Sequence, residues 1–79
     1  MNDFEEFSKV VKYHRKKAGL SQKALADIAG IGKTVVFDIE RGKKTVQLNS
    51  ILKVFAALNI KIVLDSPLMN LYNTTNEDS

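Results

Sequence analysis

Two short helical patterns separated by a glycine-containing break constrain the fold of this chain more than any other feature. The first pattern follows Ser21, a favourable residue for capping the N-terminus of a helix, and the second runs from about Lys33 to Arg41. Residues 29–32 interrupt the helical spacing, and Gly30 can adopt the positive φ of a tight turn. The apolar positions at helical spacing are Ala24, Leu25, Ile28, Val36 and Ile39. Two short helices joined by a tight turn form a helix-turn-helix motif.

Helical periodicity continues on both sides of this motif. Residues 3–18 place Phe7 and Val11 on one apolar stripe, and residues 48–58 form another that ends at Asn59, a candidate helix C-cap. Residues 42–47 are predicted to form a loop. Because 79 residues suffice for one small domain only, we expect a single all-α domain of four or five helices.

The segment 60–64, IKIVL, is β-branched and partly alternating, which predicts a short strand. A lone strand needs a hydrogen-bonding partner, and no other segment has a strand-like pattern. We therefore expect a homodimer in which Ile60, Ile62 and Leu64 belong to a strand that pairs with its copy across a two-fold axis. The alternative is an extended segment packed on its own core.

The strand is expected to end the domain, which then spans residues 1–65. Residues 66–79 are predicted to form a flexible polar tail, because most of them are polar. A few apolar residues in this tail would either anchor on a partner or be inert in the free protein: Leu68, Met69, Leu71 and Tyr72.

Composition excludes several classes of function. The chain has no Cys and one His, so disulfides, thiolate zinc sites, a Cys nucleophile and a transition-metal site are not expected, and neither is a cofactor. No Ser has an evident base partner, and residues 30–34 lack the spacing of a phosphate loop, so we do not expect an enzyme. No apolar run approaches a membrane span of about 18 residues, and the acidic N-terminus lacks the apolar stretch of a signal peptide. These features predict a cytoplasmic protein.

Positive charge is concentrated in one part of the chain. Residues 9–44 contain ten Lys or Arg against three acidic residues, a local charge of +7 in a chain whose net charge is +3. Such a block is either an electrostatic footprint for nucleic acid or a solvated lysine-rich surface.

The segment from Leu20 to Thr45 resembles the Xre/Cro/C1-type helix-turn-helix proteins. The residues that carry the resemblance are Leu20, Ser21, Gln22, Leu25, Ala26, Ala29, Gly30, Ile31, Val36, Ile39, Glu40, Arg41 and Gly42. The continuation, ERGKKTV followed by a helix and a short apolar strand, is similar to the HipB-like antitoxins. The resemblance implies a lambda-repressor-like fold that binds double-stranded DNA.

In this family the second helix of the motif enters the major groove with its N-terminal residues first. At 100° per residue, the outward-facing candidates for base contact are Lys33, Thr34, Phe37 and Asp38. Lysine can donate to guanine, phenylalanine can contact a thymine methyl, and aspartate can accept from the cytosine amino group. The alternatives are phosphate contact alone for Lys33 and Thr34, a packing role for Phe37, and pairing with Arg41 or a nearby lysine for Asp38.

The resemblance also implies a set of phosphate contacts around the motif. The candidates are Ser21, Gln22, Arg41, Lys43, Lys44 and Thr45. Such contacts position a protein on DNA without discriminating sequence. Relatives often bury an ion pair between the first helix and the end of the recognition helix, and the matching residues here are Arg15 and Glu40.

Three functions remain compatible with the sequence. The first is a transcriptional repressor that binds an operator palindrome, serves as the antitoxin of a HipA-like kinase toxin and represses its own operon. The second is a stand-alone, phage-type repressor without a toxin. The third is a protein-interaction module without DNA binding, which the +7 block disfavours.

Overall fold

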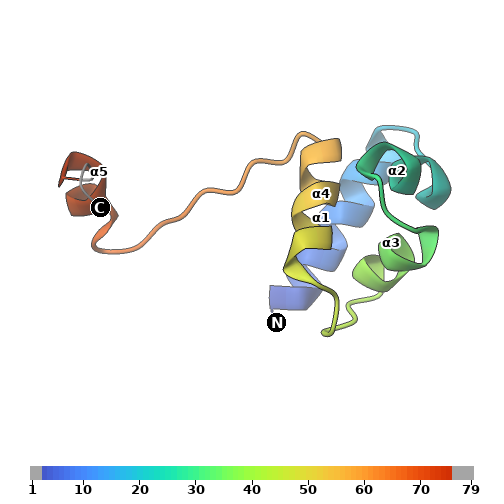
Figure 1. Ribbon diagram of the computed structural model, residues 1–79, viewed down its shortest axis with the longest axis horizontal. Coiled ribbons are helices and arrows are strands. Elements are labelled where there is room, and N and C mark those ends of the chain that lie inside the picture. Colours follow the sequence, from blue (N-terminus) through green and yellow to red (C-terminus); the bar gives the residue numbers. More distant parts are fainter. Residues whose placement is uncertain (1–2, 76–79) are drawn as a thin grey trace.

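The computed structural model describes residues 3–75, and the regular secondary structure within that range is all α-helix. Its five helices are α1 (Asp3–Lys17), α2 (Gln22–Ala29), α3 (Lys33–Glu40), α4 (Leu48–Ala57) and α5 (Met69–Thr75). Helices α1 to α4 pack into one body, and α5 lies apart from it at the end of an extended segment (Figure 1). The predicted all-α class is confirmed, and the first four helices begin and end close to their expected bounds.

Local capping explains why α2 begins and ends where it does. The Ser21 hydroxyl accepts a hydrogen bond from the backbone N–H of Ala24 at 3.0 Å, so one of the unpaired donors of the first turn is satisfied. At the other end, Gly30 has a φ of 75°, and the N–H of Ile31 donates to the carbonyl of Ala26 at 3.0 Å. This tight turn is why the connection from α2 to α3 is short.

Helix α4 ends with the same geometry, although no glycine is present. Asn59 has a φ of 59°, a left-handed conformation that asparagine tolerates better than most residues. The N–H of Ile60 then donates to the carbonyl of Phe55 at 2.8 Å. The predicted helix termination at Asn59 is confirmed, and Ile60 turns back against the core.

The core contains one fully buried side chain from each of the first four helices: Val11, Leu25, Val36 and Val54. Around them lie Ala26, Ile39, Ile51 and Phe55, which are also buried. The rings of Phe7 and Phe55 meet edge to face, with centroids 5.8 Å apart, and so join α1 to α4. Packing of the α2–α3 motif against α1 and α4 fixes the outer face of α3.

Three apolar residues expected on inward faces are exposed instead. Ile28, Leu48 and Leu52 have relative exposures of 59%, 65% and 42%. Short helices bury only the narrow stripe that meets a neighbour, so apolar residues on the flank of that stripe remain in solvent.

The predicted strand over residues 60–64 is absent from the described single chain. Residues 60–66 have no regular secondary structure, and Ile62, Val63 and Leu64 are exposed. A strand exists only when its N–H and C=O groups are paired, and the described chain forms no strand to pair with this segment.

The tail contains an element that the sequence analysis does not anticipate, the helix α5. Residues 76–79 of the expected tail lie outside the described residues. Between residues 3 and 75, every helix is too short or too polar to cross a membrane.

Candidate nucleic-acid interface

A buried ion pair joins the first helix to the end of α3. Arg15 Nε lies 2.6 Å from Glu40 Oε2, and Arg15 Nη2 lies 3.1 Å from Glu40 Oε1, so the contact is bidentate. The two side chains are 11% and 4% exposed. The hydrogen bond to Glu40 raises the pKa of the Arg15 guanidinium, so Arg15 stays protonated. The ion pair that the resemblance implies is therefore present.

Further hydrogen bonds tie the start of α2 and the end of α3 to this pair and to α1. Arg15 Nη1 donates to the carbonyl of Leu20 at 2.8 Å, directly before α2. Gln22 Nε2 donates to Glu40 Oε1 at 3.2 Å, and the Ser8 hydroxyl donates to the Glu40 carbonyl. Glu40 is thus held by α1 and α2 together, and the direction of α3 is fixed at its C-terminal end.

The outward face of α3 carries three exposed side chains from the predicted base-contact set. Lys33, Thr34 and Phe37 are exposed and line one hollow together with Gln22 of α2. This hollow therefore lies between the start of α2 and the outward face of α3. One N–H of the Gln22 amide is bound to Glu40, and an amide has a second N–H that can donate to a phosphate.

Asp38 differs from the other three candidates because its carboxylate is already paired. Arg41 Nε donates to Asp38 Oδ1 at 3.0 Å, and Lys43 Nζ lies 3.6 Å from Asp38 Oδ2. The hydrogen bond from Arg41 lowers the pKa of Asp38, and the charge of Lys43 lowers it further against the opposing effect of burial. The structure thus shows the pairing that the sequence offered as the alternative to base contact.

Arg41 also lies against the exposed ring of Phe37. Its Cζ is 5.7 Å from the ring centroid, which is within the range of a cation–π contact. The guanidinium is therefore held from two sides, by a ring and by a carboxylate, on the outer surface of α3.

Two lysines of α1 lie beside Arg41 and the outward face of α3 and form a basic surface with Arg41. The sequence alone did not assign them to the interface. Lys12 and Lys16 line a second hollow that also includes Gln22, Phe37 and Arg41. They are four residues apart and so lie on one face of α1. That spacing is visible in the sequence, but only packing shows that this face adjoins α3.

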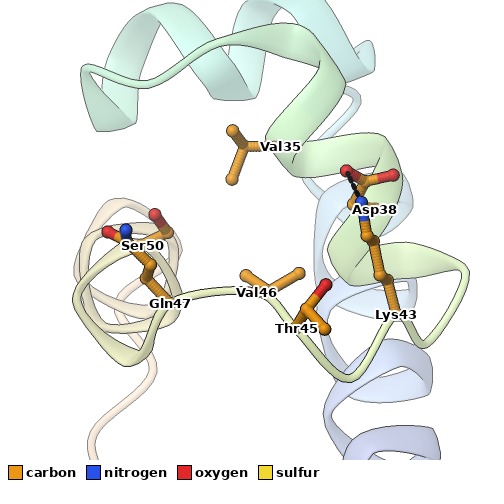
Figure 2. Close-up of a pocket in the computed structure, with 7 residues that line it drawn as sticks. All are labelled: Val35, Asp38, Lys43, Thr45, Val46, Gln47 and Ser50. Atoms are coloured by element: carbon orange, nitrogen blue, oxygen red, sulfur yellow. Dashed lines mark ion pairs between the residues drawn. The ribbon is translucent and has the colours of Figure 1, made fainter.

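The loop after α3 places the remaining phosphate-contact candidates near its flank. Lys43, Lys44 and Thr45 are exposed. Figure 2 shows Lys43 reaching from this loop to Asp38, with Thr45 beside them and Val46 nearer to the first turn of α4. Ser21, the last candidate, is exposed, and its hydroxyl already caps α2.

The described residues contain no group of three or more His, Cys, Asp or Glu side chains that could hold a metal ion. What the surface offers is exposed polar and aromatic groups on a short helix, with cations on both sides. Such a surface matches the electrostatic and hydrogen-bonding character of DNA. The fold and this surface define a helix-turn-helix protein of the DNA-binding type.

Comparison with known proteins supports this class. The helix-turn-helix family model (HTH_3) matches residues 11–64. An uncharacterized HTH-type transcriptional regulator of Sinorhizobium fredii, y4mF, is 36% identical over 58 residues, which cover 73% of this chain and 76% of that protein. A chain of the solved HipA-HipB-O2-O3 complex has a TM-score of 0.76 at 19% identity, over 85% of this chain and 94% of that chain.

The chain belongs to the helix-turn-helix family of transcriptional regulators. The resemblance of residues 20–45 to the Xre-type proteins is thereby confirmed. The likeness to the chain in the HipA-HipB complex shows a shared fold.

Replacing Glu40 tests the buried ion pair. Glu40→Ala leaves the Arg15 guanidinium buried without its partner, so we expect it to lower the free energy of unfolding by about 3–5 kcal/mol. Urea denaturation followed by circular dichroism measures this change. The control is Lys23→Ala, which breaks the exposed pair with Asp27 and should change stability by less than about 1 kcal/mol. Equal small effects of both variants would contradict the structural role of the pair.

The pairing of Asp38 predicts a pH dependence. Its pKa is lower in the folded than in the unfolded protein, so the stabilisation is complete above the unfolded pKa and is lost as pH falls through the folded pKa. Arg41→Ala should raise the pKa of Asp38, measured by NMR titration of the carboxylate carbon. Lys44→Ala, which removes a cation outside these pairs, should leave it unchanged. An Asp38 pKa that is the same in wild type and Arg41→Ala would refute the pairing.

Proposed function

We propose that this protein is a sequence-specific transcriptional repressor that inserts α3 into the major groove of double-stranded DNA. The observation that carries this proposal is the exposure of Lys33, Thr34 and Phe37 on α3, with cations of α1 and of the following loop on either side. The N-terminal end of α3 bears two of these side chains, and recognition helices enter the groove with that end first.

Within this arrangement the side chains divide into two roles. Lys33 donates to guanine, Thr34 contacts a base or a phosphate, and Phe37 packs on a thymine methyl. Phosphates are bound by side chains around the helix: Ser21, Gln22, Arg41, Lys43, Lys44 and Thr45. The flanking pair Lys12 and Lys16 adds to this second set. The first group selects the sequence, and the second supplies affinity that depends on salt.

We further propose that the repressor is a homodimer joined by residues 60–64. This segment leaves the body in an extended path (Figure 1), and Val63 and Leu64 are 84% and 73% exposed. Pairing with the same segment of a second copy satisfies its backbone groups and covers Ile62 and Leu64. Two recognition helices related by the dimer axis would then meet successive major grooves about 34 Å apart, which calls for a palindromic operator.

A finer proposal concerns the biological setting. We propose that the protein is a cytoplasmic antitoxin that binds a HipA-like kinase toxin and represses their shared operon. Its support is the similarity of fold to a chain of the HipA-HipB-O2-O3 complex, together with the ERGKKTV segment. Co-expression with a kinase-like protein encoded beside it should yield a complex of fixed stoichiometry. The absence of such a complex would leave the stand-alone repressor.

Lys33 and Lys44 are expected to respond differently to truncation. Lys33→Ala should cost roughly 1–3 kcal/mol of binding free energy on a specific duplex and relax specificity at one base pair. Lys44→Ala, which removes a phosphate-contact candidate that is not paired with Asp38, should weaken binding to all duplexes alike and lower the salt slope by about one. Fluorescence anisotropy on a specific and a scrambled duplex, over a series of salt concentrations, separates the two effects. Equal losses on both duplexes for both variants would contradict base contact by Lys33.

Proline substitution tests the dimer strand. Alternate residues of an antiparallel pair exchange hydrogen bonds, and proline lacks the N–H, so Ile62→Pro or Val63→Pro should disrupt the pairing. Sedimentation equilibrium should show a dimer for wild type and for the control Ile62→Thr, which keeps the N–H and a β-branched side chain. A dimer mass that survives both proline variants would rule out pairing through this segment.

A further inference from the structure

We propose that Asp38 is a specificity-determining residue whose carboxylate holds Arg41 and Lys43 in the free protein and finds a new partner only on DNA that offers a cytosine amino group. This inference rests on the proposed function, since it assigns a role within the same interface. It differs from simple base contact because the same carboxylate also controls when two cations become available to phosphates.

The geometry of the free protein supplies the first step. Arg41 and Lys43 reach Asp38 from different positions, one from the end of α3 and one from the following loop, and each binds a different carboxylate oxygen. The Asp38 side chain is only 16% exposed, whereas the side chains of Arg41 and Lys43 are 52% and 43% exposed. Figure 2 shows the Lys43 side chain extending from the loop to the Asp38 carboxylate on α3.

The second step follows from what DNA does to such an arrangement. Arg41 and Lys43 are candidates for phosphate contact, and a phosphate competes with Asp38 for both. When the cations turn to phosphates, the carboxylate is left beside a polyanion and needs a hydrogen-bond donor. The amino group of cytosine is the major-groove donor that aspartate accepts from.

Discrimination results from the difference between two kinds of DNA. At a site with a cytosine in reach, both cations bind phosphates and the carboxylate is satisfied. On other sequences, the carboxylate either keeps its cations, so two phosphate contacts are lost, or remains unpaired among phosphates. Disfavouring wrong sequences through an unsatisfied charge is an effective source of specificity.

The test uses a duplex selected from a random-sequence library by the full-length wild-type protein, and a shuffled duplex of the same composition. We expect Asp38→Ala to bind the shuffled duplex roughly tenfold more tightly at low salt and to gain little on the selected duplex. Its salt slope on the shuffled duplex should steepen by about one to two, because each freed cation that reaches a phosphate contributes about 0.9.

Base substitutions locate the contact. Each cytosine of the selected duplex is replaced in turn by thymine, which presents an acceptor in place of the amino group. One position in each half-site should cost wild type roughly tenfold in affinity and cost Asp38→Ala less than about threefold. If no cytosine position shows this dependence on Asp38, the inference is overturned.

Two further variants serve as controls. Asp27→Ala makes the same change of charge at an exposed lysine pair on α2, where Lys23 Nζ lies 3.4 Å from Asp27, and should leave the ratio of selected to shuffled affinity unchanged. Asp38→Asn removes the charge but keeps a hydrogen-bond acceptor, and it should also reduce the ratio. Thermal melts of all variants establish that they are folded.

The outcomes separate this inference from the proposed function. If wild type selects no sequence from the library, the proposed function fails and the inference fails with it. If wild type discriminates but Asp38→Ala strengthens binding to both duplexes equally, Asp38 only repels DNA and the inference alone is overturned. A lowered ratio in both Asp38 variants, but not in Asp27→Ala, supports it.

Discussion

The ion pair between Arg15 and Glu40 is the interaction on which the arrangement of the interface depends. It crosses from α1 to the last residue of α3, while Gln22 and Ser8 bind the same glutamate from α2 and α1. A helix as short as Lys33–Glu40 has little stability of its own and takes its direction from its contacts. The buried pair at one end and the apolar contacts of Val36 and Ile39 along its length therefore fix which side chains face outward.

A second electrostatic feature separates the cations of the interface into two groups. Arg41 and Lys43 are engaged by Asp38, whereas Lys12 and Lys16 border the neighbouring hollow on the α1 side. A net charge of +3 conceals this difference, because it counts every lysine and arginine equally. Under the proposed function, the charge available to DNA depends on which of these pairs open, and the pairs lie at the end of α3 and in the loop after it.

Much of the fold follows from the sequence alone, because the information is local. Ser21, Gly30 and Asn59 act within a few residues, and the apolar spacing of α1 to α4 is that of an ordinary amphipathic helix. The same periodicity does not show how wide the buried stripe of each helix is. It therefore does not predict that Ile28 and Leu48 are exposed. Helix α5 has weak local signals and lies apart from the core in Figure 1.

The candidate site divides in the same way. The outward positions of Lys33, Thr34 and Phe37 follow from helical geometry, as does the i to i+3 pairing of Asp38 with Arg41. The contribution of Lys12 and Lys16 to the basic surface depends on how α1 packs beside α3. The helical periodicity of each segment does not contain that information. A strand over residues 60–64 requires a second chain, so a single chain can show only an extended segment in which residues 61–64 are exposed.

The most direct measurement is fluorescence anisotropy of the wild-type protein with DNA from upstream of its own gene and with scrambled DNA, across a series of salt concentrations. The proposed function predicts tight, salt-dependent binding with a clear preference for the upstream DNA, because Lys33, Thr34 and Phe37 contact bases while the surrounding cations bind phosphates. Equal binding to both duplexes, or no binding at physiological salt, would contradict sequence-specific autoregulation by this protein alone.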